Sequence, residues 1–259
     1  VPPTRHCGAG AWSMASCATC RAVPGNRLPA ATLAEMAYSP GNAGPNYGLS
    51  AARSQQWEVG AKWRGNSHQW EAAWFDTRSQ GEIVPMVSIG GRSVYQNVDN
   101  VRRRGLELAW RATVGAWSPR ASYTYLDAHF GSGYQGAGGA SVAAGNRLPG
   151  TARHVAQLAI DHAPAPQWRV GGTLSVSSAV FANDTNTESA AGFAVVGLHA
   201  SYQLRSAAEG TPRWQFWARL DNLFNRRYAG TLIVNDGNGR FFEPAAGRRL
   251  MVGVRAQFL

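Results

Sequence analysis

Apolar and polar residues alternate with a period of two along much of this chain, and this alternation constrains the fold more than any other feature. Successive side chains of a β-strand point to opposite faces, so a period of two predicts strands with one apolar and one polar face. An early segment carries Trp57, Val59, Ala61 and Trp63 at every second position. The last segment carries Leu250, Val252, Val254, Ala256 and Phe258 in the same way. The chain is therefore predicted to be all-β.

The connections between these segments also alternate, between short turns and long polar or glycine-rich loops. Nine strands are predicted, at 53–64, 67–80, 93–116, 120–130, 150–163, 167–181, 192–205, 213–224 and 248–259. Short turns are expected near 65–66, 117–119, 164–166 and 206–212, and long loops near 81–92, 131–149, 182–191 and 225–247. This arrangement predicts an antiparallel up-and-down sheet with short turns at one end and long loops at the other.

Composition excludes two broad classes of protein. Hydrophobic residues make up 44% of the chain and aromatic residues 10%, which is incompatible with a disordered segment. The sequence has no run of about 18 apolar residues, which excludes a helical membrane protein. Charged residues make up only 15%, whereas soluble domains average about 25%.

Two all-β architectures then remain: a soluble barrel of the lipocalin type with its apolar face inward, and a transmembrane barrel with its apolar face outward. Most of the predicted strands exceed ten residues, whereas strands of soluble proteins average about 5 to 6. Aromatic residues gather toward the strand ends, as membrane interfaces favour, at Trp57, Trp63, Trp117, Trp168, Tyr202 and Trp214. These features favour an antiparallel up-and-down transmembrane β-barrel.

The net charge of +10 comes almost entirely from arginine, because Lys62 is the only lysine. A nucleic-acid surface needs basic residues clustered on one face and interleaved with aromatic residues. The single basic run, 102–104, leads directly into an alternating strand, so we expect no nucleic-acid partner and arginines dispersed along strand faces and membrane edges.

The three cysteines, Cys7, Cys17 and Cys20, all lie in the first twenty residues. The spacing of Cys17 and Cys20 fits half of a zinc site, but no second pair follows at a suitable distance. We therefore expect no metal site and no cofactor, and the sequence assigns no role to the cysteines.

Motifs of the common hydrolases are missing from the sequence: it contains neither G-x-S-x-G nor H-E-x-x-H. Asp127 and His129 lie near a predicted loop end and share a strand face, as residues of an outer-membrane protease could. A pair this close in sequence arises readily by chance, so we predict that the protein is not an enzyme.

Several segments, taken in order, resemble the TonB-dependent outer-membrane receptors. The segment 221–228 (DNLFNRRY) is similar to the family's N-L-F-(D/N)-x-x-Y motif, and 242–249 (FEPAAGRR) resembles its P-x-x-G-R signature before the last strand. Residues 103–107 (RRGLE) resemble the x-x-G-x-E that opens a strand in the middle of the barrel. Residues 145–149 (GNRLP) and 32–36 (TLAEM) match two further family segments. The resemblance covers about residues 28–259.

Structural roles are expected for the residues of these motifs. They are Gly105, Glu107, Asn222, Leu223, Phe224, Tyr228, Pro244, Gly247, Arg248 and Phe258. We expect Asn222 and Tyr228 to form turn hydrogen bonds, and Gly247 to permit a backbone bend. Phe258 resembles the terminal aromatic residue that the barrel-insertion machinery recognises in this family, although Leu259 follows it here.

The resemblance implies a receptor in the Gram-negative outer membrane that takes up a scarce ligand, most commonly a ferric siderophore, with outer-membrane lipid around it. Its energy would come from the TonB–ExbB–ExbD system through a plug domain. Family barrels have about 22 strands and a plugged lumen, so this chain is expected to hold only the C-terminal nine to ten strands. No TonB box and no plug are identified in it.

Residues 1–27 do not fit the family pattern, and we expect them to be an atypical segment left by truncation or a frameshift, with the partial barrel at 28–259. Part of 8–20 could supply a tenth strand. The alternative function is a small passive porin or structural barrel, which needs no plug. An incomplete barrel has open edges that cannot face lipid, so we expect such a chain expressed alone to aggregate.

Siderophore complexes are usually anionic, so arginine and polar residues in the long loops and upper lumen are the candidate ligand-binding residues. They are Arg92, Tyr95, Tyr134, Gln135, Arg147, Arg153, Asn183, Asp236, Asn238 and Arg240. A second set is expected to face the lumen and form ion pairs between strands or contact the plug: Glu107, Arg111, Arg153, Arg219 and Arg255.

Overall fold

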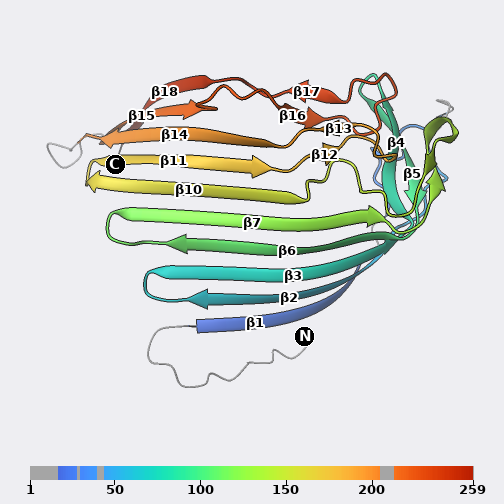
Figure 1. Ribbon diagram of the computed structural model, residues 1–259, viewed down its shortest axis with the longest axis horizontal. Helices are drawn as coiled ribbons and strands as arrows, with labels where there is room; N and C mark the ends of the chain where they lie inside the picture. Colours follow the sequence, from blue (N-terminus) through green and yellow to red (C-terminus); the bar gives the residue numbers. More distant parts are fainter. Residues whose placement is uncertain (1–16, 28–29, 40–43, 205–212, 259) are drawn as a thin grey trace.

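The computed structural model describes residues 17–27, 30–39, 44–204 and 213–258. Its main feature is a ten-stranded sheet in which neighbouring strands are antiparallel (Figure 1). In order across the sheet the strands are β1 (Cys17–Arg27), β2 (Arg53–Arg64), β3 (His68–Gln80), β6 (Val101–Ala112), β7 (Trp117–Phe130), β10 (His154–Ala165), β11 (Trp168–Ser177), β14 (Phe193–Gln203), β15 (Arg213–Asp221) and β18 (Arg249–Gln257). Only the backbone of β1 is described. This order confirms the predicted up-and-down arrangement.

Short β-pairs lie in the four long connections; six of their eight strands fall in predicted loops, and two fall in the predicted strands 93–116 and 167–181. The pairs are β4 (Glu82–Ile89) with β5 (Arg92–Val98), β8 (Tyr134–Gln135) with β9 (Ser141–Val142), β12 (Val180–Phe181) with β13 (Ser189–Ala190), and β16 (Ala229–Leu232) with β17 (Phe242–Pro244). A 3-10 helix, η2, spans Ala137–Gly139. Among the residues described, no helix is long and apolar enough to cross a membrane.

Several of the predicted boundaries are wrong; the segment 167–181, for example, contains both β11 and β12. The segment 93–116 is two strands, β5 and β6, because Asn100 takes a positive φ of 53° that ends the first one. The turn expected at 117–119 lies at 113–116, where Val114 and Trp117 form a bridge around Gly115 with a φ of 58°. The turn expected at 206–212 lies outside the described residues.

A tenth strand is present, as the sequence allowed: it begins at Cys17, inside the expected segment 8–20, and continues to Arg27. It pairs in register with β2 along its whole length, from Cys17 opposite Arg64 to Arg27 opposite Ser54. The main sheet thus includes residues on both sides of the expected boundary at 27. Cys7 lies outside the described residues.

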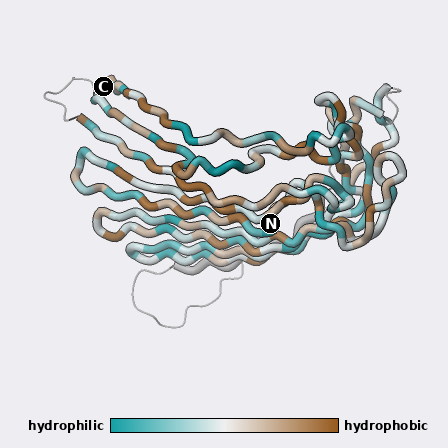
Figure 2. The backbone as a smooth tube through the Cα atoms, turned by 45° about the horizontal axis from the view of Figure 1, so that its top comes forward, coloured by the Kyte–Doolittle hydropathy of each residue, from teal (hydrophilic) through white to brown (hydrophobic). Residues whose placement is uncertain are grey.

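The predicted alternation places apolar side chains on one face of the sheet, and many of these side chains are exposed. Trp57, Trp70 and Val252 expose 61%, 51% and 71% of their surface. Hydrophobic and hydrophilic residues follow one another along the strands (Figure 2). We call the face with these residues the apolar face. A soluble barrel would turn it inward, whereas a membrane barrel turns it toward lipid.

Candidate functional site

The four long connections gather at one end of the sheet, on the right in Figure 1. We call residues 82–98, 134–148, 180–190 and 229–244 the loop crown. A buried apolar cluster joins the crown to the ends of β6 and β7, and its members are Val84, Val98, Val101, Ala128, Phe130, Val142 and Leu148. Val101 pairs with Phe130 across the two strands, so both side chains point to the face opposite the apolar one. The crown therefore packs over that face, here called the loop-covered face.

Asn235 ties three connections of the crown together. Its side-chain Nδ2 donates to the carbonyl oxygen of Pro85 at 2.7 Å and to Oδ2 of Asp184 at 2.8 Å. Its backbone N–H donates to the carbonyl oxygen of Ala182, and its own carbonyl accepts from Ser88. One residue with a φ of 53° thus links the β4–β5 hairpin, the β12–β13 turn and the loop after β16.

The carboxyl group at the centre of this linkage is buried: Asp184 exposes only 5% of its surface. Burial raises the pKa of the Asp184 carboxyl group because it disfavours the charged form. Burial and the nearby Asp184 carboxylate also raise the pKa of the Tyr134 hydroxyl well above its ordinary value. The interior of the crown is thus a low-dielectric environment that favours neutral groups.

The outer part of the crown is polar; Ser88 is buried there, whereas residues 237–240 are exposed. Ser88 near the tip of β4 bridges to Asp236, and the N–H of Gly237 donates to the carbonyl of Ser88 at 2.8 Å. Asp236 Oδ1 accepts from the backbone N–H groups of Asn238 and Arg240, both at 2.9 Å. The tip of the β4–β5 hairpin and the 235–240 turn therefore lie side by side.

The same hairpin positions Arg92. Gly90 and Gly91 form a two-residue turn with positive φ angles of 58° and 77°, a conformation that favours glycine. Arg92 follows this turn, and its guanidinium lies 5.2 Å from the centre of the Tyr38 ring. We call Arg92, Asp236, Asn238 and Arg240 the crown tip. It offers two guanidinium groups and backbone donors to an anionic ligand.

Below the crown, the loop-covered face carries ion pairs between neighbouring strands. Their members are Lys62, Glu71 and Arg111; Arg120, Asp161 and His199; and Arg219, Asp221 and Arg249. Arg103 also contacts Glu82 of the crown through two hydrogen bonds. The pairing of residues across neighbouring strands places all of these side chains on the polar face of the sheet. The wall under the crown is thus lined with paired charges.

A sheet of this kind, with short turns at one end and a crown of long loops at the other, is typical of outer-membrane barrels. A family model described as TonB dependent receptor-like, beta-barrel, matches residues 24–223. The chain belongs to the TonB-dependent receptors. The family consists of receptors and transporters and is not an enzyme family.

Solved structures of the same fold agree with this assignment. The chain is similar to the siderophore receptor PiuA from Acinetobacter baumannii, with 20% identity, a TM-score of 0.67, and coverage of 93% of this chain and 33% of that one. It is similar to the ferric yersiniabactin uptake receptor FyuA from Yersinia pestis, with 18% identity, a TM-score of 0.65, and coverage of 94% and 35%. It is also similar to the copper transporter OprC, with 20% identity, a TM-score of 0.70, and coverage of 92% of this chain and 36% of that one. The chain spans about a third of the length of these structures.

The fold of the receptor brings four of the predicted ligand-binding residues together at the crown tip: Arg92, Asp236, Asn238 and Arg240. Tyr95 lies on the same hairpin, opposite Pro85, and its carbonyl accepts from Asn46 Nδ2. Tyr134 lies inside the crown, packed edge-on against Phe130, whereas its neighbour Gln135 is exposed.

The other predicted ligand-binding residues lie elsewhere in the receptor. Asn183 stabilises its own turn, because its Oδ1 accepts from the backbone N–H groups of Thr187 and Glu188. Arg153 was expected to face the lumen, which is wrong: its Nη2 lies 3.5 Å from Oδ1 of Asp127, a residue on the apolar face. The bend before β10 turns it there.

Arg147 is the most constrained of these arginines. It forms a bridge with His129, and its guanidinium lies 5.9 Å from the centre of the Phe181 ring. Its Nε and Nη2 atoms are buried without a hydrogen-bond partner. Burial and the positive charge of Arg153 lower the pKa of the Arg147 guanidinium.

The family motif at 221–228 has the structural role that was expected of Asn222. Its Nδ2 donates to the carbonyl oxygens of Arg226 and Ala246, and its Oδ1 accepts from the N–H of Arg226. Tyr228 differs, because its ring packs 4.2 Å from the ring of Phe193 and its backbone carbonyl, not its hydroxyl, accepts from Ala245.

Gly247 has a steric reason for being glycine that the sequence did not predict. Its φ is not positive, but a Cβ atom there would lie 2.8 Å from Oδ1 of Asn225. That same oxygen accepts from the N–H of Arg248. The remaining motif residues hold varied positions: Leu223 donates its N–H to Val196, Pro244 pairs with Ala229, and Phe224 and Phe258 are exposed.

The predicted lumen residues are confirmed in part. Arg111 in β6 lies 3.7 Å from Glu71 in β3, as predicted, whereas Arg219 lies 2.6 Å from Asp221 of its own strand, β15. Within the described residues, no ion pair is found for Glu107 or Arg255. Both stay on the polar face, as their register requires.

Sequence reasoning missed the central residues of the crown, Asp184 and Asn235. Asn235 belongs to an N-D-G-N-G run, which is a strong turn signal and could have marked the segment. No pattern in the sequence indicates that this turn meets Asp184, because the two residues are 51 positions apart.

Proposed function

We propose that this chain is part of an energy-coupled importer in the Gram-negative outer membrane and that its ligand is a ferric siderophore. The observation that supports this most is the loop crown, which covers the polar face of the sheet and presents Arg92 and Arg240 outward. Of the similar structures described above, one is a siderophore receptor by name, one is a ferric yersiniabactin uptake receptor, and the third is a copper transporter. Iron is cargo in this proposal and not a resident cofactor.

The residues of the chain would act by binding and guiding, without covalent chemistry. The guanidinium groups of the crown tip attract an anionic complex, and two-fold hydrogen bonding from arginine suits carboxylate and catecholate oxygens. The paired charges below the crown line the route of the ligand. Coupling to TonB would pass through a plug domain, as the family resemblance implies.

A passive porin is the second candidate, and the structure offers it less support. A porin needs an open lumen, whereas the crown is tied together by Asn235 over the lumen wall. A hydrolase is also disfavoured, because Asp127 pairs more closely with Arg104 than with His129. Its Oδ2 atom lies 3.0 Å from Arg104 but 3.8 Å from the His129 ring.

Uptake of radioactive iron tests the proposal in cells that produce the protein from its native gene. Iron would be supplied as ferric citrate, ferric enterobactin or ferrichrome, with and without a protonophore. We expect uptake of one complex to stop when the protonophore is added. Uptake that is insensitive to the protonophore and equal for unrelated small solutes would establish the porin instead.

The double variant Arg92→Ala/Arg240→Ala tests the crown tip. Losing two charge-assisted hydrogen bonds should reduce uptake at limiting ligand by at least about tenfold. Arg169→Ala is the matched control, because Arg169 is an exposed arginine at the opposite end of the sheet, in β11. An equal effect of both changes would contradict ligand binding at the crown tip.

A further inference from the structure

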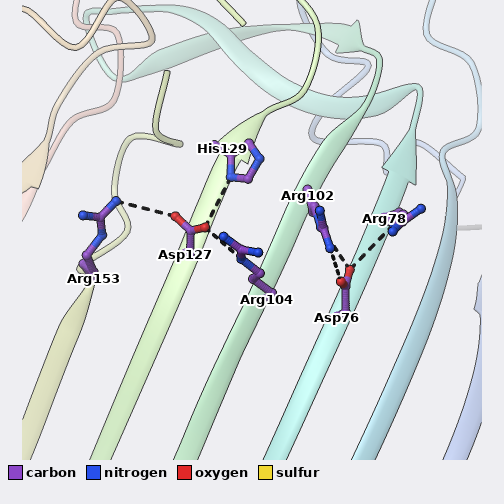
Figure 3. A network of polar contacts seen from close by, with 7 residues as sticks. All are labelled: Asp76, Arg78, Arg102, Arg104, Asp127, His129 and Arg153. Atoms are coloured by element: carbon purple, nitrogen blue, oxygen red, sulfur yellow. Dashed lines mark hydrogen bonds and ion pairs between the residues drawn. The ribbon is translucent and has the colours of Figure 1, made fainter. Parts of the chain in front are cut away.

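Seven polar residues form two neighbouring groups of polar contacts across β3, β6 and β7 and the start of β10, one around Asp76 and one around Asp127 (Figure 3). We call them the arginine belt: Asp76, Arg78, Arg102, Arg104, Asp127, His129 and Arg153. Asp76 contacts Arg102 by two hydrogen bonds and lies 3.8 Å from Arg78. Asp127 lies 3.0 Å from Arg104 and 3.5 Å from Arg153. The uptake route proposed above uses none of these contacts.

The register places the belt on the apolar face of the sheet. Directly opposite residues of an antiparallel pair share a face, and every second residue of a strand returns to it. Asp76 is opposite Arg104, and Arg104 is opposite Asp127. Two residues further along each strand, the same face carries Trp74, Leu106 and Tyr125. The loop crown packs over the other face, and it reaches the belt where Arg147 forms a bridge with His129.

The belt lies at a definite level along the strands. Below it the apolar face of β7 carries Tyr125, Tyr123, Ala121, Pro119 and Trp117 in succession. The eight residue steps from Trp117 to Tyr125 span about 27 Å along the strand, or about 20 Å of height at a tilt of about 40°, against an apolar band of about 25 Å in membrane barrels. Tyr125 and Trp117 mark the aromatic rows at its two edges. The belt is one row beyond Tyr125, on the side of the long loops, where the lipid headgroups of the outer leaflet would lie.

The charge of the belt suits phosphate. Four arginines stand against two aspartates, which leaves an excess of two positive charges when His129 is neutral. The guanidinium groups remain accessible, because the side chains of Arg78, Arg104 and Arg153 are 71%, 50% and 43% exposed. Each carboxylate contacts two of the arginines and holds them in place. Anchored, exposed guanidinium groups are the side chains that best recognise phosphate in two-fold geometry.

We propose that the arginine belt is a binding site for the phosphate groups of outer-leaflet lipid headgroups. The site holds a phosphorylated glycolipid against the outside of the barrel, with its acyl chains along Trp74, Leu106 and the rows below. The inference rests on the membrane location in the proposed function but not on the transported ligand. It also gives the two carboxylates at this level a role, since they fix the arginines that the lipid contacts.

Lipid binding to the detergent-purified protein, taken from outer membranes and titrated with lipid A, tests this site. The variant Arg78→Gln/Arg104→Gln leaves each carboxylate one arginine partner, Arg102 for Asp76 and Arg153 for Asp127. Each substitution removes one positive charge near the membrane surface. The affinity for diphosphorylated lipid A should therefore fall about 30-fold in the double variant. Affinity for lipid A without phosphate groups should not change between the two proteins.

The matched control is Arg111→Gln/Arg120→Gln, because both side chains are 61% exposed but lie on the polar face. An equal loss in this control, or no loss in the belt variant, would overturn the proposal.

The proposed location is checked separately by density fractionation of membranes. Fractionation of the protein away from the outer membrane would refute the location and the uptake function together. Outer-membrane location with intact siderophore uptake but no phosphate-dependent lipid binding would refute only the lipid site.

Discussion

At the scale of single residues, Asn222 shows how a short motif acts through its local geometry. It exposes only 3% of its surface, has a φ of 52°, and satisfies three backbone groups with its side chain. Asparagine tolerates this left-handed conformation better than other residues with a β-carbon. The residue therefore ends β15 and fixes the loop that follows.

Asn222→Ala should lower the free energy of unfolding by about 2 to 4 kcal/mol, because buried backbone groups lose their partners and the φ becomes unfavourable. Asn222→Gly should cost about 1 kcal/mol less, since glycine accepts the φ. Urea unfolding of the native barrel in lipid vesicles measures both. Equal losses of unfolding free energy in the two variants would show that the backbone conformation contributes nothing. Asn238→Ala serves as a control at an exposed asparagine.

Asp184 predicts a pH dependence of the loop crown. Because burial raises its folded pKa above the unfolded value of about 3.9, the folded crown binds the proton more tightly. Crown stability should thus be greatest below about pH 4 and decline as the pH rises through the folded pKa. Hydrogen exchange of residues 182–188 from pH 3 to pH 7 measures this decline.

Asp184→Asn should remove the decline, because the amide does not ionise. Glu188→Gln is the control, since Glu188 is exposed and its change should leave the profile as it was. A decline that persists in Asp184→Asn would assign the pH dependence to another group.

At the scale of elements, the strands and their faces followed from the period of two, whereas the loops did not. Eight of the nine predicted segments each correspond to one strand of the main sheet; in the ninth, 93–116, the break at Asn100 was missed. The β-pairs inside the long connections were missed as well. They are short, and their pairing is stabilised by contacts within the crown, such as Val84 and Val98 against Val101.

Gly105 in β6 provides a test of strand packing. A Cβ atom there would lie 2.6 Å from Cζ of Phe75 and would also meet the carbonyl oxygen of Tyr125. Gly105→Ala should therefore lower the unfolding free energy by about 1 to 3 kcal/mol. Gly60→Ala is the matched control, since its nearest atom would be 3.4 Å away, and it should cost less than Gly105→Ala. The reverse order in urea unfolding would contradict the packing described here.

At the scale of the whole molecule, the two faces of the sheet have opposite environments. Leu108 on the apolar face and Glu107 on the polar face are neighbours in β6. In a membrane barrel, Leu108→Arg should cost about 2 to 4 kcal/mol, because its charge would face lipid near the midplane. Glu107→Arg should change stability by less than about 0.5 kcal/mol.

Unfolding in lipid vesicles compares the two variants under the same conditions. Equal costs, or a greater cost for Glu107→Arg, would mean that the apolar face does not contact lipid. Retention of both variants in a heat-modifiable form on gels is the control for folding.

The outer edges of the described sheet, β1 and β18, each pair on one side only. Unpaired backbone groups are too costly to face the lipid interior, so the membrane form requires further strands at these edges. This agrees with the strand number of related barrels and with the share of their length that the chain spans.

By itself the sequence determined the fold class, the two faces and the family, because the period of two and the motifs are local patterns that need no partner. Only the tertiary structure decided which loop residues meet. Arg92 and Arg240 were predicted separately, but it is the bridge of Ser88 to Asp236 that brings their segments together. Arg153, at a bend before β10, contacts Asp127 on the apolar face, and the period of two does not extend through such a bend. Long-range contacts join residues whose separation leaves no trace in the local pattern.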